Sequence, residues 1–380
     1  MAHDSAPGTA PAGPWPDGVP ALADPAGGIT LRAHRRTDQP DMIEACNDPE
    51  VVRWSTVPIP EGGYSSAEAE EYYRIVRAGW ASGERLSWAI EGEFEGRRRF
   101  CGSIDLRVDG RQGEVGYLLH PAARGRSMMS TALRLVRDHA FEVVGLEAIH
   151  WRAVVGNWSS RRVAAAAGFV FDGTVRRCLD HRGELLDGWQ ATITRDDPRA
   201  PLPWLDPPRL TGPRAVLRPF SETDADRVVQ ACTDPRTRHW LVSMPQPYTH
   251  HDALDYIELT RELAARRSGL AWCIADPHDD RCLGSISLEG FGGYSRRAEI
   301  GYWAHPSARG LGVVTAAVRL VTAYAEEVGL VDSIVIRCAA GNTASRHVAE
   351  GSGYTQAGVL PASEPLGDGE LADLISYSRP

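Results

Sequence analysis

The sequence predicts two tandem α/β domains, each built on a mixed, mostly antiparallel sheet with flanking helices. Three observations indicate this. The chain has 380 residues, which is enough for two domains. The segment ITLRAHRRTDQPDMIEACNDPEVVRW from Ile29 and the segment AVLRPFSETDADRVVQACTDPRTRHW from Ala215 share LR, TD, AC, DP and a final Trp in register. Each copy then continues with several strand-like runs and one strand–helix–strand crossover, which places two parallel strands in its sheet.

The domain boundaries follow from the repeat and from local composition. Residues 1–28 are rich in Pro, Ala and Gly, and we expect a disordered leader because so few apolar side chains cannot offset the entropy of ordering. The two copies predict domains at residues 29–197 and 211–380. Between them, residues 198–210 contain several prolines, which are typical of a semi-rigid linker.

The first elements of each copy are predicted from local signals. The repeat opens with a short apolar strand, and a helix around the shared AC follows and ends near DP. A capping box opens a second helix, with Ser65 and Glu68 in the first copy and Thr249 and Asp252 in the second. Three β-rich runs follow, namely LSWAI, FCGSIDLRV and EVGYLL in the first copy and LAWCIA, CLGSISLEG and AEIGYWA in the second.

The second half of each copy holds the crossover. Apolar residues at three- and four-residue steps predict a helix after the third run. They are Met129, Ala132, Val136 and Ala140 in the first copy and Val314, Ala317, Val321 and Tyr324 in the second. A strand (AIHWRAV or SIVIRCA), a short helix after a GN turn, and closing strands complete each copy.

Composition restricts the function. A net charge of −9 argues against bulk binding to nucleic acid and favours a cationic or amine-bearing substrate. All 41 strongly basic residues are Arg, which favours a GC-rich bacterial genome. The seven Cys form no CxxC pair and the His residues form no HxxxH or HExxH motif, so we expect reduced thiols and no metal site. The chain has neither an apolar run of about 18 residues nor a secretory signal, so we expect a cytoplasmic protein without a membrane partner.

The junction between the third run and the crossover helix carries the clearest functional motif. It reads HPAARGRSMMSTALRLV from His120 to Val136 and HPSARGLGVVTAAVRLV from His305 to Val321. The first amides of a helix lack intrahelical acceptors, the helix dipole makes that end positive, and Gly lets an anion approach. An Arg adds a fork of donors that suits phosphate. The alternative is an ordinary tight turn, but two aligned copies favour a diphosphate site.

The two predicted cradles are not equal. In the second copy the cradle comprises Arg309, Gly310, Leu311, Gly312, Val313, Val314 and Thr315. In the first it comprises Arg124, Gly125, Arg126, Ser127, Met128, Met129 and Ser130. If the position of Gly312 needs a positive φ, the Ser127 of the first copy costs about 1 kcal/mol or more. We therefore expect the second copy to be the better cofactor site, and the first to be a slower site or a structural partner that shapes the acceptor cleft.

These motifs together resemble a known family. LR near the start, E-(V/I)-G-Y, HP-x-A-RG-x-(G/S), GN-x-x-S-R and G(F/Y) occur in this order in both copies. The set resembles the GNAT superfamily of acyl-CoA N-acyltransferases, and more narrowly the Rim-type subgroup that acetylates the N-termini of ribosomal proteins. The resemblance covers both domains and implies that acetyl-CoA lies where two parallel strands splay apart. It also implies that the cradle holds the diphosphate of the cofactor and that Asn342 and Asn157 lie near its pantetheine arm.

The resemblance implies direct transfer of the acetyl group to an amine, which must first lose a proton. Glu299 is the candidate general base, with Glu114 as its counterpart, and the alternative for each is a solvated strand carboxylate. Ser345 and Ser160 occupy the position from which relatives return a proton to sulfur. A role in capping the helix is the alternative for these two serines.

Trp240 and Trp54 end the first block of the repeat and precede Pro-rich loops. In the resembling subgroup this region walls the acceptor site, and the alternative is a Trp that packs its loop onto the core. The two copies are expected to pair internally as a pseudo-dimer, in a chain that is a monomer or a homodimer.

The sequence thus favours an N-acetyltransferase that uses acetyl-CoA. The acceptor is a primary amine of a small molecule, a peptide or a protein N-terminus, and modification of natural products or resistance is a fitting context. The alternative is a non-catalytic acyl-CoA-binding or scaffold protein with one or both sites degenerate. A domain that acts on a CoA thioester without an amine, such as a decarboxylase, is a third possibility that no residue selects.

Overall fold

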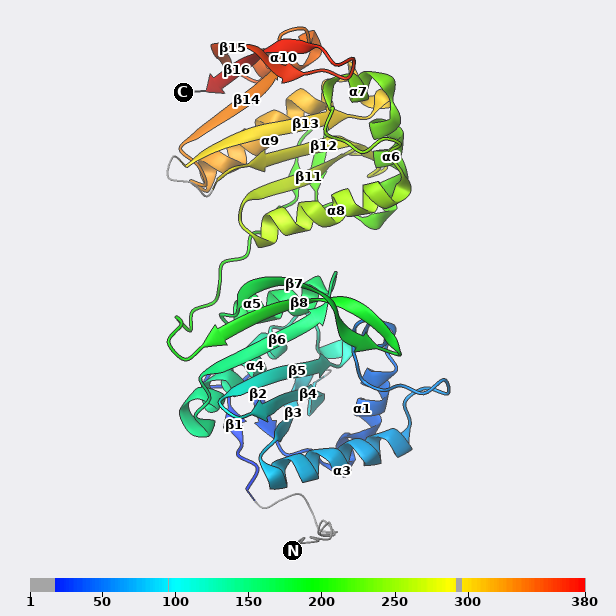
Figure 1. Cartoon of the computed structure of the whole chain (residues 1–380), viewed down its shortest axis with the longest axis vertical. Coiled ribbons are helices and arrows are strands. Elements are labelled where there is room, and N and C mark those ends of the chain that lie inside the picture. The colour runs from blue at the N-terminus through cyan, green and yellow to red at the C-terminus, as the bar shows by residue number, and fades with distance from the viewer. Residues whose placement is uncertain (1–17, 95, 292–295, 380) are drawn as a thin grey trace, which may run out of the picture. The chain divides into compact units, whose positions relative to one another are not determined.

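The computed structural model describes residues 18–94, 96–291 and 296–379. The chain forms two compact units, Met1–Pro203 and Trp204–Pro380, and the described part of each contains an eight-stranded sheet. Figure 1 shows the helices that flank each sheet. The predicted α/β fold class with two tandem domains is confirmed.

The first unit has the strand order β1-β2-β3-β4-β5-β6-β8-β7. Its strands are β1 (Leu22–Ala23), β2 (Ile29–Arg32), β3 (Arg85–Phe94), β4 (Arg97–Asp109), β5 (Gln112–Leu119), β6 (Ala148–Val154), β7 (Val170–His181) and β8 (Glu184–Thr194). Its α-helices are α1 (Gln39–Cys46), α2 (Pro49–Trp54), α3 (Ser66–Ser82), α4 (Met128–His139) and α5 (Trp158–Ala166). Short 3-10 turns at η1 (Arg36–Asp38) and η2 (Pro121–Ala123) and a π turn at η3 (Ala140–Val144) complete it.

The second unit repeats this plan, with the order β15-β16-β14-β13-β12-β11-β10-β9. Its strands are β9 (Leu210–Thr211), β10 (Val216–Arg218), β11 (Gly269–Ala275), β12 (Cys282–Glu289), β13 (Arg297–Ala304), β14 (Ser333–Ala339), β15 (Thr355–Pro365) and β16 (Leu371–Arg379). Its helices are α6 (Ala225–Thr233), α7 (Pro235–Trp240), α8 (His250–Ala265), α9 (Val313–Glu327) and α10 (Thr343–Gly351), with 3-10 turns at η4 (Glu222–Asp224) and η5 (Pro306–Ala308).

Each sheet contains a parallel pair whose strands separate along their length. In the first unit Gln112–Val115 of β5 pair with Ala148–Trp151 of β6. In the second, Arg297–Glu299 of β13 pair with Ser333–Val335 of β14. Beyond these residues β13 continues to pair with β12, and β14 with β16. The carboxyl-terminal halves of the two strands are therefore not bonded to each other, and the predicted splay is confirmed.

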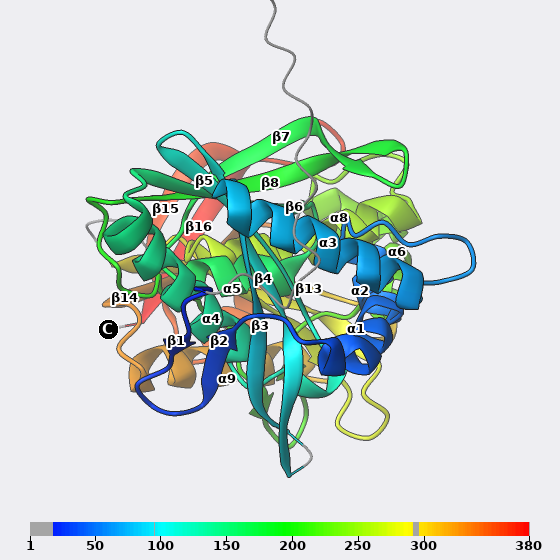
Figure 2. The ribbon, with the colours of Figure 1, turned by 90° about the horizontal axis from the view of Figure 1, so that it is seen from below.

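The strands send alternate side chains to two separate apolar clusters. In the second unit the fully buried Trp272 joins a cluster with Val318 of α9. The next residue, Cys273, joins a second cluster with Val228 of α6 and Ile257 of α8. In the first unit, α4 and α3 lie on opposite sides of the strands in the same way (Figure 2). The crossover helix and the N-terminal helices thus approach the splayed strands from opposite faces.

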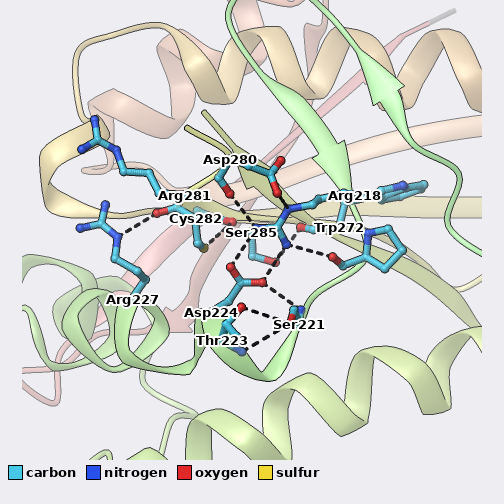
Figure 3. Close-up of polar contacts among 12 residues, drawn as sticks. Arg218, Ser221, Thr223, Asp224, Arg227, Trp272, Asp280, Arg281, Cys282 and Ser285 are labelled. Carbon is cyan, nitrogen blue, oxygen red and sulfur yellow. Dashed lines mark hydrogen bonds and ion pairs between the residues drawn. The ribbon is translucent and has the colours of Figure 1, made fainter. Parts of the chain in front are cut away.

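The repeated LR and TD dipeptides form a buried ion pair in each unit. Arg218 of β10 donates from Nη1 and Nη2 to the two carboxylate oxygens of Asp224, at 2.8 and 2.9 Å, and Asp224 also accepts from the amide of Ser221 at 2.9 Å (Figure 3). Arg32 and Asp38 make the same two contacts at 2.8 Å each. Because both charges are satisfied by bidentate geometry, the pair fixes the first strand to the turn that opens the next helix.

The expectation of a disordered leader through residue 28 is wrong for residues 18–28, and residues 1–17 lie outside the described chain. β1 pairs with β2, and the buried indole of Trp88 donates to the carbonyl oxygen of Pro20 at 3.0 Å. In the second unit the indole of Trp272 donates to the carbonyl oxygen of Pro208 at 2.8 Å. Each leading segment is ordered because it covers a sheet edge and satisfies a buried N–H. The end of the expected linker therefore belongs to the second unit.

His34 predicts a pH dependence of the stability of the first unit. Its ring is fully buried, Nε2 lies 3.3 Å from Ser87 Oγ, and burial lowers the pKa of the imidazole to about 4. In the unfolded chain His34 binds a proton near pH 6.5, whereas in the folded chain it stays neutral until about pH 4. The free energy of unfolding therefore falls by about 3 kcal/mol in total as the pH falls from 6.5 to 4. In His34→Phe, which copies Phe220 of the second unit, this loss should disappear.

Urea unfolding of the intact chain at pH 7.5 and pH 4.5 measures this effect. The pH-induced loss of unfolding free energy should be smaller in His34→Phe, and also in His34→Gln, than in the unchanged chain. An identical loss in all three proteins would show that His34 is not the responsible group.

Candidate active site

A cavity of about 750 Å³ lies in the second unit where β13 and β14 separate. It brings together most of the residues that the sequence predicts for this copy. Its lining includes Trp240, Glu299, Arg309, Gly310, Gly312, Val313, Val314, Thr315, Asn342 and Ser345. Leu311 is not part of the lining, and 58% of its surface is exposed. Further lining residues come from β13, from Arg337, Cys338 and Ala339 of β14, and from α7, α10 and β15.

The turn before α9 leaves backbone amides pointing out of the helix start. Gly310 and Gly312 have φ values of 77° and 73°, and α9 begins at Val313. The first i to i−4 bond runs from the amide of Ala316 to the carbonyl oxygen of Gly312, at 3.1 Å. The amides of Val313, Val314 and Thr315 therefore have no acceptor within their own helix. The predicted cradle has the backbone that an anion site needs.

The first unit has the same turn with a different residue at its critical position. Gly125 has a φ of 73°, and Ser127, which precedes α4, has a φ of 56°. The position occupied by Gly312 thus does require the left-handed region, and Ser127 adopts it at a cost of about 1 kcal/mol. Met128 and Met129 are buried behind the turn, and Arg126 donates to the carbonyl oxygen of Glu93 at 3.5 Å.

The arginine of each cradle is joined to a neighbouring helix. Nη2 of Arg309 binds Asp234 Oδ1 and lies 2.8 Å from Thr237 Oγ1. Asp234 caps α7, and its contact with Arg309 lowers the pKa of the carboxyl group. In the first unit Arg124 binds Asp48, the cap of α2. These contacts fix α7 and α2 to the cradles, and the binding of phosphate by Arg309 and Arg124 stays a prediction.

The two candidate bases differ in the charged groups that surround them. Glu299 accepts a hydrogen bond from Nε of Arg337 on β14, at 2.9 Å, and stands directly opposite Glu289 of β12. Glu114 of the first unit binds two arginines, Arg107 on β4 and Arg152 on β6. Both carboxylates are partly exposed and ion-paired, so neither is simply a solvated carboxylate.

Asn342 caps α10, because its Oδ1 accepts the amide of Ser345 at 3.1 Å. Asn157 accepts the amide of Ser160 in the same way. The asparagines therefore cap these helices, and the alternative that the serines cap them is wrong. The Ser345 hydroxyl instead lies 2.9 Å from Tyr302 Oη.

Tyr302 and its counterpart Tyr117 are functional candidates that the sequence reasoning missed. Tyr117 lies 3.0 Å from the hydroxyl of Ser160, which also accepts from the indole of Trp151 at 3.1 Å. Burial raises the pKa of Tyr302, so its hydroxyl keeps its proton. The signal was present, because this Tyr ends the E-(V/I)-G-Y motif in both copies.

Trp240 lies in the wall of the cavity and against the GN turn. A Cβ on Gly341 would lie 3.5 Å from the Trp240 ring, and one on Gly156 would lie 3.3 Å from the Trp54 ring. Each Trp ring therefore lies against the GN turn of its own unit, with less room at Gly156 than at Gly341. Packing of the loop onto the core and contact with an acceptor both stay predictions for these residues.

A second cavity of about 480 Å³ adjoins the first. The two share Leu241, Gly301, Tyr302 and Trp303, which lie at the carboxyl-terminal end of β13 and just after α7. The second cavity lies under α8, and its lining includes Tyr256, Ser285, Ser287 and Glu289. Gly301–Trp303 of β13 therefore form a common wall of the two cavities.

One further buried cluster joins Asp224, Cys273 and Cys282, whose ligand atoms lie within 4.8 Å of one another. The oxygens of Asp224 already bind Arg218 and the amide of Ser221 (Figure 3). We assign no metal there, because a cation would lie beside the guanidinium.

Both units contain a splayed strand pair, a helix start with outward amides and a strand carboxylate, in the same arrangement. This arrangement is that of an acyl-group transferase in two tandem domains. The chain belongs to the GNAT acetyltransferase family, because the family described as acetyltransferase (GNAT) domain matches residues 29–170 and 214–355. No described helix is long and apolar enough to cross a membrane.

The chain is similar to curated bacterial proteins over about the length of one unit. It is 30% identical over 170 residues to a putative ribosomal N-acetyltransferase, YdaF, of Bacillus subtilis, covering 43% of this chain and 89% of the relative. It is 31% identical over 101 residues to the ribosomal-protein-serine acetyltransferase of Escherichia coli, covering 27% and 56%.

Solved structures with similar folds include the microcin C7 self-immunity acetyltransferase MccE in complex with acetyl-CoA and AMP. It is 23% identical with a TM-score of 0.40, and the match covers 44% of this chain and 93% of that one. The ribosomal L7/L12 acetyltransferase RimL in complex with coenzyme A is 22% identical with a TM-score of 0.41, covering 44% and 94%.

Proposed function

We propose that this protein transfers an acetyl group from acetyl-CoA to a primary amine of a small molecule, a peptide or a protein N-terminus, with the second unit as the working site. Membership of the acetyltransferase family supports this donor and this reaction. The relatives that are named ribosomal-protein acetyltransferases favour a protein N-terminus among the three kinds of acceptor.

One observation carries the proposal: a single cavity extends from the start of α9 to Glu299. At one end the amides of Val313, Val314 and Thr315 have no intrahelical acceptor, and a Cβ added at Gly310 would meet no atom within 4 Å. This open, positive helix start fits a diphosphate. Along the wall, residues of β13 beyond Glu299 are unpaired with β14, so their backbone groups can bind the donor arm and polarise its carbonyl.

Acetyl-CoA supplies a thioester, whose carbonyl carbon bonds to the amine nitrogen while the carbon–sulfur bond breaks. Glu299 takes one proton from the acceptor ammonium, which makes the nitrogen a nucleophile. Ser345 and Tyr302 form a hydrogen-bonded pair of hydroxyls at the other side of β13. This pair can donate a hydrogen bond or a proton to the departing sulfur.

For the first unit we infer a structural or slower role. Glu114 is held by two guanidinium groups, whereas Glu299 contacts one. Ser127 adds a cost at the cradle that Gly312 does not. These two observations support a degenerate site in this unit.

The test measures release of free thiol from acetyl-CoA by the intact chain. The acceptor panel contains peptides with free N-termini, simple alkyl amines and an aminoglycoside, and mass spectrometry identifies the product. We expect thiol release that depends on the acceptor and a product heavier by one acetyl group. Tight binding of CoA without acceptor-dependent release by any amine would favour a non-catalytic acyl-CoA-binding protein instead.

A further inference from the structure

We propose that the second cavity binds the acceptor as a cationic amine, with Glu289 recognising a positive charge beyond the one that reacts, and that Arg107 and Arg85 close the corresponding space in the first unit. This inference rests on the proposed function in taking the cavity beside Gly301–Trp303 as the acceptor side. It adds the chemical class of the acceptor and a residue that selects it.

The sheet register places different residues at equivalent positions in the two units. Glu289 pairs with Gly269 on one side and with Glu299 on the other. In the first unit Arg107 pairs with Arg85 and with Glu114 in the same way. The position opposite the candidate base is therefore a carboxylate in the second unit and a guanidinium in the first.

This exchange reverses the local charge. Glu289, Glu299 and Arg337 give two carboxylates and one guanidinium in the second unit. Arg107, Glu114 and Arg152 give one carboxylate and two guanidiniums in the first. Directly opposite side chains on an antiparallel pair have Cβ atoms about 5 Å apart, so the charge at position 289 acts on any ammonium beside Glu299.

The same exchange changes what lies over the glycine next to the candidate base. In the first unit the guanidinium of Arg107 covers Gly116, because a Cβ there would lie 3.5 Å from its Nη2. Gly116 stands opposite Asp105, as Gly301 stands opposite Ser287. Gly301 is one of the residues that the two cavities of the second unit share.

The deeper part of the space is filled in the first unit by a polar network. Arg85 donates from Nε to Asp105 Oδ2 at 2.9 Å, and Tyr72 donates to Asp105 Oδ1 at 3.2 Å. Gly269 and Ser287 occupy the positions of Arg85 and Asp105 in the second unit. They are too small to fill the space, and Ser287 lines the open cavity.

The residues that line the second cavity indicate what kind of molecule fits there. The ionisable carboxylates there are Asp252, Asp255 and Glu289, and no Arg or His is among the described residues that line it. Apolar and aromatic walls come from Met244, Pro245, Tyr248, Tyr256, Leu259 and Trp303. Asp252 is engaged in the cap of α8, and Asp255 lies 3.6 Å from Nε2 of His251 on the same helix. Glu289 is exposed at the end of β12 and has no ion-pair partner among the residues that the structure describes. An amine with an apolar body and a second cationic group fits these walls.

The test compares 1,6-diaminohexane with 1-aminohexane, which have the same six-carbon chain and differ by one ammonium group. Calorimetry measures the binding of each to the intact chain saturated with CoA. We expect the diamine to bind about fivefold tighter than the monoamine, since an ion pair with an exposed carboxylate such as Glu289 contributes up to about 1 kcal/mol. The preference should fall below about twofold in Glu289→Gln, and Glu327→Gln, at the end of α9, should leave it unchanged.

Glu289→Arg copies the first unit and should weaken the binding of both amines by more than about 50-fold while CoA binding is unchanged. A diamine preference that survives in Glu289→Gln, or amine binding that survives in Glu289→Arg, overturns the inference. Because the experiment measures binding, its result does not depend on catalysis. A chain that prefers the diamine but releases no thiol would contradict the proposed function and still support this inference.

Discussion

Aspartate at position 312 is expected to raise KM for acetyl-CoA by about 100-fold or more in the intact protein. Gly312 has a φ of 73° immediately before α9, a conformation that Asp tolerates better than most residues. Ser127 adopts the same conformation in the folded first unit, and the atom that a Cβ at Gly312 would crowd is the end of the flexible Arg214 side chain, so the unit should stay folded. The added carboxylate would lie beside the amides that we assign to the diphosphate and would repel the phosphate charges. Steady-state kinetics with a saturating amine measures the effect.

The first unit supplies a matched control for this substitution. Ser127→Asp places the same carboxylate on the same backbone, since Ser127 has a φ of 56° at the start of α4. We expect it to change turnover by less than about twofold. If Ser127→Asp were as harmful as Gly312→Asp, the first unit would have to contribute to the measured activity. If neither change mattered, the diphosphate would have to lie elsewhere.

Glu299→Gln is expected to lower kcat by about 100-fold or more at pH 7, which is the usual contribution of a positioned base. The side chain keeps its shape and can still contact Arg337, so the cavity should keep its form. The defect should shrink as the pH approaches the pKa of the acceptor amine, because the amine then loses its proton to solvent. A pH profile of kcat for the variant and the unchanged chain measures both effects.

Glu114→Gln is the control in the first unit, where the carboxylate binds Arg107 and Arg152. We expect turnover to change by less than about twofold. A Glu299→Gln enzyme with normal kcat at pH 7 would exclude Glu299 as the base, whatever the behaviour of Glu114.

The backbone of the cradle could be predicted from sequence because it depends on local residues. A Gly at position 310 and another at 312, between a strand and an apolar-striped helix, predict a turn with positive φ, and the structure has it at both. The parallel strand pair was equally predictable, since a strand–helix–strand crossover forces one parallel contact, whereas its splay was implied only by the family resemblance. The capping boxes at Ser65 and Thr249 form as expected.

The partners of the charged residues could not be predicted, because they come from distant parts of the chain. Arg309 binds Asp234, which lies 75 residues away, and Arg337 of β14 binds Glu299 of the neighbouring β13, 38 residues away. The repeat also hid a difference between the copies. Glu114 and Glu299 look equivalent in the aligned motif, and only the pairing of β4 and β12 with their neighbours reveals Arg107 opposite one and Glu289 opposite the other.

The leader was misjudged for a similar reason. Its composition favours disorder, but two of its residues complete a sheet edge and the carbonyl group of Pro20 satisfies the indole of Trp88. Such a contact depends on a buried donor far along the chain, which composition does not describe.

A crystal structure of the intact chain with CoA would show where the cofactor binds. We predict that the diphosphate lies at the start of α9, accepting hydrogen bonds from the amides of Val313, Val314 and Thr315, with the pantetheine arm between β13 and β14. A diphosphate bound only at the turn before α4, or at neither turn, would show that the start of α9 is not the cofactor site.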